Sequence, residues 1–525
     1  MRITLLVCGM SVMFSVAVAH GSGPEDEEET KPRIALRSVP NDLTEPDAVQ
    51  NLHAVLVTPW SVILSWTAPG DDGADGIADL YDIRMAEGVL DDGKAQWEIT
   101  YEATGPFAPG LSGSQEACTV SGLEPLTEYS FLLKTSDEVP LWSDPSNIVT
   151  VTTPDDLGVL LVSPDGNAEF STIQAAIDAA TAGELDPGFP GRFIILADGV
   201  YRGSGNRGLN FRGKRVSLIS LSGNPAACII DCEGEDRGFS RFPMLPYLDP
   251  QRGGLGPPRI QGLTIRNGQD EDGGGVLCDR ARVLFVQCHF INNYASNGSG
   301  GAIAFEKGAG TFVQCIFERN EAAEVGGAVS LYRSTCDFRR CEFRGNMAER
   351  GGAVAAVESA LPPVWEPLPA FQDSLLNFHS CLIYANHANE SGGAIHCSDA
   401  DLTVNQCTLS HNRAIDTGGA IHCRRECRVE MVNSIISFSS NVSDVIHCDG
   451  GDILIFLACC NLYRNEDGNY VGCIKGRDSQ GGNISVNPLF RDAQAGDFHL
   501  SKDSPCAPLR GYDCIFYGSY GAHLW

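Results

Sequence analysis

Three histidines occupy the same place in successive copies of one short motif. The sequence Gly-Gly-Ala-Ile-His-Cys stands at residues 392–397 and again at 418–423, and a looser copy carries the third histidine. These histidines are His396, His422 and His447. If the copies stack as neighbouring strands, the imidazoles lie about 4.8 Å apart. Neutral imidazoles in such a row can bind a divalent metal such as zinc, and a plain ladder of stacked side chains is the alternative.

A group of aspartates forms a second set of candidate ligands. The segment Thr67–Arg84 carries Asp71, Asp72 and Asp75, and Asp79 follows closely. Carboxylates at this spacing can hold Ca²⁺. The ligand order of an EF-hand loop is absent, and aspartates are also common in solvated turns. Calcium is therefore a candidate cofactor, with solvated turn residues as the alternative.

The histidine motif belongs to a longer series of repeats. Two landmarks recur along residues 274–465 with a step close to 26 residues. The first is a glycine pair followed by a small and an apolar residue, and the glycine pair fits a corner of the chain. The second ends in an asparagine, which fits a turn because its side chain bonds the backbone and it tolerates left-handed dihedrals. Complete copies of the second landmark are Cys288–Asn293, Cys315–Asn320, Cys341–Asn346, Cys381–Asn386, Cys407–Asn412 and Cys460–Asn465.

Repeats of this length indicate a solenoid, in which each unit buries its apolar face against its neighbours. Strand side chains alternate between two faces, so Ile395 and Cys397 should point inward, and Ala394 and His396 outward. The sequence therefore predicts an all-β chain containing a right-handed parallel β-helix with three short strands per coil. The equivalent inward residues of the other copies are Val276, Ile303, Val329, Val354, Ile421 and Ile446.

The cysteines of the repeats fall in inward columns, where a free thiol acts as a small apolar side chain. Neighbouring strands in register direct their Cβ atoms in parallel, which is a poor geometry for a disulfide. We therefore expect most of the 20 cysteines to be reduced. The pairs expected to be exceptions are Cys228 with Cys232, Cys423 with Cys427, and Cys506 with Cys514.

The repeats resemble those of a known family. Residues 290–293, 317–320 and 343–346 each read Phe-x-x-Asn, and they alternate with the Gly-Gly-Ala motifs. This pairing is similar to the repeats of the chlamydial polymorphic outer-membrane proteins, within the wider pectin-lyase-like group of right-handed β-helices. The resemblance covers about residues 156–510. It implies the β-helix architecture and an adhesin-like role, and it says little about activity.

Catalysis on a β-helix would need its own residues. A polysaccharide lyase uses clustered carboxylates that hold calcium and a basic residue that accepts the proton. The outward positions next to the repeated apolar residue carry no carboxylate, and the Asn-Thr-Asp and Gly-His-Gly motifs of polygalacturonases are absent. An active site would therefore lie beside the insertion that contains Trp365 or beside the excursion Arg237–Pro258. Trp365 is also a candidate for binding a ligand.

The amino-terminal third has a different character. Residues 1–20 carry Arg2, an apolar run and small residues before residue 20, which predicts a cleaved signal peptide. Residues 21–45 form an acidic linker. Residues 46–153 contain short alternating runs separated by turns, which favours a β-sandwich. This segment resembles a fibronectin type III domain, whose core positions match Trp66, Leu123 and Tyr129.

The solenoid is expected over residues 156–515. It should open with a helix at 171–182, capped by Ser171, whose apolar face plugs the first coil. That face carries Ile173, Ala176, Ile177 and Ala180.

Charge and composition narrow the range of partners. The net charge of -30 argues against a nucleic-acid partner, because phosphate binding needs a basic surface. Beyond residue 20, no stretch is apolar and long enough to cross a bilayer. We expect a monomeric protein, secreted or at the cell surface, that binds a glycan or a surface protein without catalysis. The alternatives are a lyase or glycoside hydrolase acting on uronate polymers, and a structural component of the cell envelope.

Overall fold

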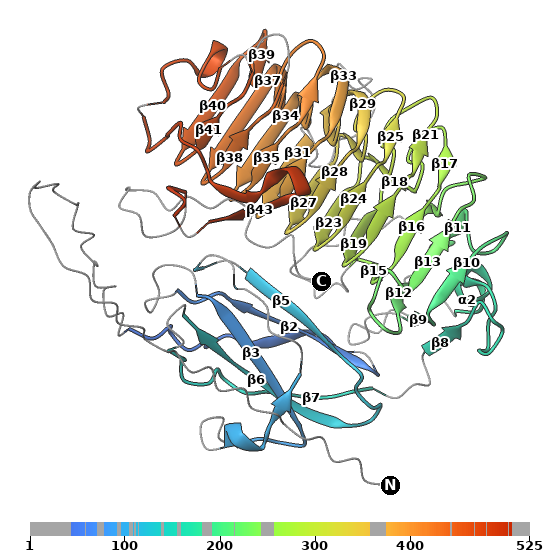
Figure 1. Cartoon of the computed structure of the whole chain (residues 1–525). Coiled ribbons are helices and arrows are strands. Elements are labelled where there is room, and N and C mark those ends of the chain that lie inside the picture. Colours follow the sequence, from blue (N-terminus) through green and yellow to red (C-terminus); the bar gives the residue numbers. More distant parts are fainter. Residues whose placement is uncertain are drawn as a thin grey trace, which may run out of the picture. The chain divides into compact units, whose positions relative to one another are not determined.

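The computed structural model describes residues 44–506, apart from segments 71–77, 92–95, 104–108, 110–111, 138–140, 155–158, 181–191, 243–256, 358–373 and 441–443 and positions 58, 114, 215, 467, 479 and 502. These residues form a β-sandwich followed by a parallel β-solenoid (Figure 1). The predicted all-β fold class is therefore confirmed. Among the described residues, no helix is long and apolar enough to span a membrane.

The sandwich consists of two antiparallel sheets. One sheet has the order β1 (His53–Val57), β2 (Ser61–Thr67), β5 (Gln115–Ser121). The other has the order β4 (Tyr101–Glu102), β3 (Leu80–Glu87), β6 (Glu128–Ser136), β7 (Val149–Thr152). A short 3-10 helix, η1, spans Trp97–Ile99.

The predicted core residues of the sandwich are buried. The ring of Trp66 packs edge-on against Tyr81, with centroids 5.0 Å apart. The backbone N–H of Glu124 donates to the hydroxyl of Tyr129 at 3.0 Å, which is the tie expected of a tyrosine corner. Leu123 lies in the same core, 2% exposed.

The solenoid opens with β8 (Val159–Val162), helix α2 (Ile173–Ala179) and β9 (Arg192–Leu196). The helix is shorter than expected, and its N-cap is Thr172 rather than Ser171. The Thr172 hydroxyl accepts from the N–H of Ala175 at 3.4 Å, which satisfies one of the free donors of the first turn. The predicted apolar face of the helix is buried in the core of the solenoid.

A coil contains four strand segments rather than the three expected. One coil comprises β18 (Val276–Asp279), β19 (Arg282–Val286), β20 (His289–Ile291) and β21 (Tyr294–Ala295). The extra segment arises because β18 and β19 are separate strands of the same sheet. In two later coils the first two segments run together as β34 (Ile395–Asn405) and β37 (Ile421–Val432).

Each segment pairs in parallel with its equivalent in the next coil, which produces long sheets along the solenoid (Figure 1). The ten-stranded sheet contains β10 (Gly199–Tyr201), β13 (Cys228–Asp231), β16 (Thr264–Arg266), β20, β24 (Ile316–Glu318), β28 (Glu342–Arg344), β32 (Leu382–Tyr384), β35 (Thr408–Ser410), β38 (Ile435–Ser437) and β41 (Asn461–Tyr463). The six-stranded sheet contains β17 (Gln269–Asp270), β21, β25 (Glu321–Ala322), β29 (Met347–Arg350), β33 (His387–Ser391) and β36 (Arg413–Ala414).

The largest sheet holds the remaining coil segments. Besides β8, β9, β18, β19, β34 and β37 these are β11 (Leu209–Asn210), β12 (Val216–Ser220), β14 (Phe239–Arg241), β15 (Arg259–Gln261), β22 (Ile303–Glu306), β23 (Ala309–Val313), β26 (Val329–Tyr332), β27 (Thr335–Arg339), β30 (Val354–Val357), β31 (Ser374–His379), β39 (Ile446–Asp449) and β40 (Ile453–Ala458). After the last coil come η3 (Gly472–Ile474), β42 (Phe490–Asp492), η4 (Ala493–Ala495) and β43 (Asp497–Leu500).

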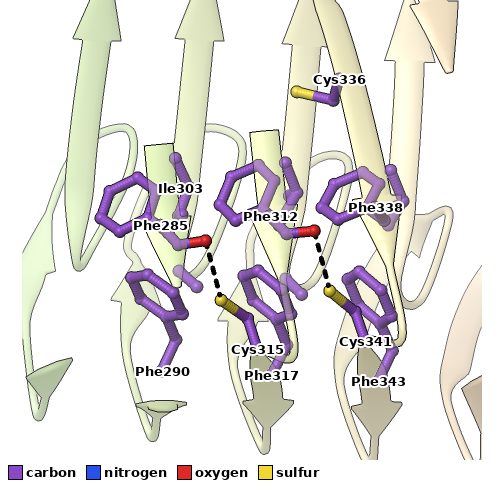
Figure 2. Close-up of a cluster of buried hydrophobic side chains, with 14 of the residues drawn as sticks. Phe285, Phe290, Ile303, Phe312, Cys315, Phe317, Cys336, Phe338, Cys341 and Phe343 are labelled. Atoms are coloured by element: carbon purple, nitrogen blue, oxygen red, sulfur yellow. Dashed lines mark hydrogen bonds between the residues drawn. The ribbon is translucent and has the colours of Figure 1, made fainter. Parts of the chain in front are cut away.

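Stacked aromatic rings fill the core of the solenoid. Figure 2 shows two parallel ladders, one through Phe285, Phe312 and Phe338 and one through the phenylalanines of the Phe-x-x-Asn motifs. Phe317 stacks on Phe343 with centroids 4.6 Å apart. The predicted inward residues of the glycine motif lie in the same core, each 0% exposed.

The asparagines of the second landmark form a buried ladder. The Asn320 side-chain amide donates to the Phe290 carbonyl at 3.0 Å and to Oδ1 of Asn346 at 2.9 Å. The left-handed dihedral belongs to the preceding residue, such as Arg319 with φ of 51°, and not to the asparagine as expected. The asparagine therefore ties successive coils together, and its neighbour makes the turn.

Most cysteines are free, as expected. The prediction of which cysteine pairs form disulfides is wrong. Cys228, Cys232, Cys423, Cys427 and Cys506 are all free thiols, and Cys514 lies outside the described residues.

One disulfide joins Cys448 to Cys473, with Cα atoms 6.1 Å apart. Cys459 is also disulfide-bonded. The thiol of Cys427 instead donates to the Arg424 carbonyl at 3.1 Å, and Cys506 Sγ accepts from the Asn461 side chain at 2.9 Å.

Candidate functional site

The three histidines stack on consecutive coils, as their spacing predicts. The rings of His396 and His422 are 4.9 Å apart, and those of His422 and His447 are 5.3 Å apart. Both pairs are inclined by only 11°. Nδ1 of His396 lies 3.2 Å from Nδ1 of His422, and His447 Nδ1 lies 3.1 Å from Oδ2 of Asp444.

The expectation that these histidines stand exposed on the outer face is wrong for two of them. His396 is 1% exposed and His422 is 5% exposed. Gly418 lies close to the ring column, because a Cβ added to it would stand 2.9 Å from the Cβ of His422. The Ser391 hydroxyl also lies 3.2 Å from Nδ1 of His396.

Burial sets the charge state of the histidine row. Burial lowers the pKa of His396 to about 3, assisted by the charge of His422 and of nearby arginines. Burial together with His447 lowers the pKa of His422 to about 4. Both imidazoles are therefore neutral at neutral pH.

The geometry of the row is that of a stacked ladder. Parallel rings direct their nitrogen lone pairs in parallel, whereas metal ligands converge on one point. Among the described residues, no group of three or more His, Cys, Asp or Glu side chains could hold a metal ion. Zinc binding at the histidine row stays a prediction. Asp71, Asp72, Asp75 and Trp365 lie outside the described residues, so calcium and ligand binding there also stay predictions.

A charged network lies on the outer surface of the ten-stranded sheet. The guanidinium of Arg344 donates to Oε2 of Glu318 at 2.6 Å and to Oε1 of Glu342 at 2.7 Å. The Tyr384 hydroxyl donates to the same Glu342 oxygen at 3.1 Å. His289 Nε2 lies 3.2 Å from Glu318 Oε2. Arg319 makes a further ion pair with Glu318.

The network holds the carboxylate of Glu318 ionised. Burial raises the pKa of Glu318, but the hydrogen bond and charge of Arg344 outweigh burial and bring this pKa below its ordinary value. The two glutamates raise the pKa of Arg344 against the effect of burial. Burial lowers the pKa of His289, although Glu318 opposes the effect. Glu318 is therefore no source of a proton, and the network suits binding of polar groups better than general acid catalysis.

An aromatic row continues the same surface toward the last coil. His411 stacks on Phe438 with centroids 4.9 Å apart, and Phe438 meets Tyr463 at 5.8 Å. Tyr384 contacts Phe498 of β43 at 5.0 Å, which braces the row. His411 is exposed, and Phe438 and Tyr463 are half-buried.

The charged network and the aromatic row share one origin in the sequence. Most of their residues occupy the two variable places of the Phe-x-x-Asn motif or its copies in successive coils. We call the surface formed by these variable places the motif face. Its residues are Ile291, Asn292, Glu318, Arg319, Arg344, Gly345, Tyr384, Ala385, Ser410, His411, Ser437, Phe438, Tyr463 and Arg464.

The sequence analysis missed the motif face because it considered only the outward positions of the glycine motif. The residue types at the two variable places of the motif could have revealed this face. In most coils these carry a charged or aromatic side chain at a point where the alternation of the strand turns it outward.

Known proteins resemble the sandwich. A family model of the fibronectin type III domain matches residues 47–152. Ephrin type-A receptor 10 of Mus musculus is 30% identical over 142 residues, which are 27% of this chain and 12% of the receptor. Calcium-activated chloride channel regulator 1 of Equus caballus is 31% identical over 145 residues, which are 25% of this chain and 16% of that protein. The chain thus spans less than a fifth of the length of either relative.

Solved structures are similar to part of the chain. Module A71 of titin from human cardiac muscle is 24% identical, covers 21% of this chain and 95% of the module, and has a TM-score of 0.17. The antiparallel sheets, the buried Trp66 and the tyrosine corner at Tyr129 agree with the family match. Residues 47–152 are therefore a fibronectin type III domain, which precedes a parallel β-solenoid.

Proposed function

We propose that this protein is an exported, non-enzymatic binding protein whose motif face holds an extended glycan. The observation that carries the proposal is the row of partly exposed rings on consecutive coils, at His411, Phe438 and Tyr463, beside the polar network around Arg344. Aromatic faces pack against the apolar faces of sugar rings. Guanidinium and carboxylate groups bond to sugar hydroxyls with charge-assisted strength.

The motif face has two accessible parts. Phe498 of β43 packs against Tyr384 and His411, and Ser410 and Ser437 are buried, so the middle of the face is partly covered. The polar network around Arg344 lies on one side of Tyr384, and the rings of Phe438 and Tyr463 lie on the other. A polar contact at one part and ring contacts at the other would give the bound chain a direction.

The chemistry of the described residues favours binding over turnover. Retaining and inverting glycosidases need one carboxyl group that is protonated and free to act as an acid. Glu318 and Glu342 instead share the guanidinium of Arg344. The residues that would support a lyase or hydrolase, around Trp365 and within 243–256, lie outside the described part of the chain.

An extracellular or surface location fits the fibronectin type III domain, since such domains are common in extracellular proteins. The two curated relatives are by name a receptor and a channel regulator. The signal peptide expected at residues 1–20 would provide the export route.

Titration of the purified protein against a panel of neutral and uronate-containing oligosaccharides tests the proposal. Phe438→Ala should weaken binding of the best ligand about tenfold, since one stacked ring is worth about 1 kcal/mol or more. Arg344→Gln should weaken it comparably. Leu454→Ala, which alters an exposed apolar residue on β40, is the matched control and should leave affinity unchanged.

Two results would overturn the proposal. One is the absence of binding to every glycan of the panel, or binding that neither substitution on the motif face changes. The other is release of unsaturated products from uronate polymers, detected by ultraviolet absorbance, which would favour the lyase alternative.

A further inference from the structure

The last coil of the solenoid leaves two of its inward side chains partly uncovered. Ile453 and Ile455 of β40 pair with Cys427 and Val429 of β37, and all four point toward the core. Cys427 is 3% exposed and Val429 is 0% exposed, because the following coil covers them. Ile453 and Ile455 are only half-buried, since no strand of the described chain pairs with the far edge of β40.

The segment that follows the last coil covers its other parts. Ile484 continues the ladder of β41, because its N–H donates to the Cys460 carbonyl at 2.9 Å. The side-chain amide of Asn483 donates to the Leu457 carbonyl at 3.1 Å, which covers the end of β40. Ile474 of η3 is 0% exposed within the core. A gap remains over the first half of β40.

This gap is a cavity of about 320 Å³, which we call the end cavity. Ile453 and Ile455 form one wall, and the disulfide between Cys448 and Cys473 forms another. Gly451, in the turn from β39 to β40, lines the cavity without a side chain to fill it. Because a water-sized group occupies about 30 Å³, the end cavity accommodates about ten non-hydrogen atoms. It is therefore large enough for a small organic molecule.

A single type of charge lines the end cavity. Arg477 is half-buried at its wall, and the Arg477 carbonyl accepts from the Asn483 side chain at 3.0 Å. Within the described chain, the guanidinium of Arg477 has no hydrogen-bond or ion-pair partner. The neighbouring Asp478 is exposed and does not line the cavity. A guanidinium beside apolar walls is suited to bind a carboxylate through paired hydrogen bonds.

We propose that the end cavity binds a small aliphatic carboxylic acid, with its hydrocarbon chain against Ile453 and Ile455 and its carboxylate at Arg477. Removal of the hydrocarbon from water supplies the affinity, and the guanidinium selects an anionic head group over a cationic one. The motif face belongs to the ten-stranded sheet, whereas the end cavity lies at β39 and β40 of the largest sheet. The inference is therefore independent of glycan binding.

Calorimetric titration of the full chain with sodium octanoate tests the site, because octanoate matches the size of the end cavity. Octanoate should bind at one site per chain. Acetate, which lacks the hydrocarbon chain, and octylammonium, which has the opposite charge, should each bind about tenfold more weakly or less. Absence of octanoate binding, or equal affinity for octanoate and octylammonium, would overturn the proposal.

The charge of the site is tested by substitution. Arg477→Gln should weaken octanoate binding about tenfold and remove the preference for octanoate over octylammonium. Arg428→Gln is the matched control, because Arg428 is an exposed arginine on the outer side of the neighbouring strand β37. It should leave both affinities unchanged. An equal loss in the two variants would reveal a general effect of charge and refute the site.

The apolar wall is tested on the same strand. Ile455→Ala should weaken octanoate binding about threefold or more, since it removes part of the wall. Leu454→Ala alters the exposed neighbour on the opposite side of β40 and should leave the affinity unchanged. In the parent chain, octanoate should slow amide hydrogen exchange at residues 453–455 and 473–477. Binding that leaves this exchange unchanged would place octanoate elsewhere and contradict the proposal.

Discussion

The imidazole of His396 stacks on that of His422 with the ring centroids 4.9 Å apart and the planes inclined by 11°. The two Nδ1 atoms are 3.2 Å apart, and the Ser391 hydroxyl also lies 3.2 Å from Nδ1 of His396. Neither ring can be charged without placing a proton beside a buried neighbour. The ladder therefore depends on neutral histidines.

Acid should destabilise the solenoid through this ladder. The pKa of an unfolded histidine is about 6.5, whereas that of His396 is about 3 in the folded chain. Below pH of about 6.5 the unfolded state binds a proton that the folded state excludes. The stability from neutral His396 is thus fully present above that pH and decreases as the pH falls toward 3.

Urea unfolding at pH 7 and pH 5 measures this effect. Linkage assigns His396 a loss of about 2 kcal/mol between these two pH values. His396→Leu should show a smaller difference between the two pH values than the parent chain. His53→Leu in the fibronectin type III domain is the control and should leave the difference unchanged. An undiminished difference in His396→Leu would contradict the assignment.

The asparagine ladder should contribute strongly to stability. Asn346 Nδ2 donates to the Phe317 carbonyl and to Oδ1 of Asn386, both at 2.9 Å. Its own Oδ1 accepts from the N–H of Asn320 at 2.9 Å. Asn346→Ala leaves several buried partners unsatisfied, and we expect the free energy of unfolding to fall by about 3 kcal/mol or more.

The residue before each ladder asparagine lies in the turn, and a substitution there serves as the control for the ladder. Asn292 is exposed and has a φ of 53°, and Ala385 has the same φ in the equivalent place of another coil. Asn292→Ala should therefore cost only about 1 kcal/mol in chemical denaturation. If Asn346→Ala costs no more than Asn292→Ala, the buried ladder is not the stabilising feature.

The glycine corners should tolerate no side chain. A Cβ at Gly327 would stand 2.2 Å from the carbonyl oxygen of Gly352 in the next coil, so the coils would have to separate. We expect Gly327→Ala to unfold at a lower urea concentration or to fail to accumulate as folded protein. Gly345 is the matched control, because its φ of 62° is close to that of residues with side chains at equivalent positions, such as Arg319 at 51° and His411 at 52°. Gly345→Asn should change stability by less than about 1 kcal/mol, and a larger loss would contradict this reading of the turn.

The repeat made much of the architecture predictable. A step near 26 residues and strict alternation around Ile395 and Cys397 were sufficient to predict stacked parallel strands and their buried column. The pairing of Ile395 with Ile421 and of Cys397 with Cys423 confirms the register. The match of Trp66 and Tyr129 to the core of a sandwich was predictable for the same reason, since local alternation decides which side of a strand is buried.

The disulfide was not predictable in this way. Cys448 belongs to a repeat, but Cys473 lies in the cap, where the landmarks are absent. From the sequence, we expected disulfides between cysteines close in the chain, such as Cys423 and Cys427. Their thiols bond to carbonyls or fill the core, whereas the cap brings Cys473 over the last coil.

The sequence by itself determined the fold class, the period of the coils and the inward columns, because these follow from repeated local patterns of polarity. Only the tertiary structure decided which outward residues are accessible. His396 lies on the outer side of its strand yet is buried, because the ring of His422 stacks on it and the Ser391 hydroxyl lies 3.2 Å from its Nδ1. Arg344 and Phe438, in the variable places of their motifs, stay partly accessible, whereas Ser410 and Ser437 in the same kind of place are buried. Accessibility depends on what the next part of the coil covers, and a strand pattern does not contain that information.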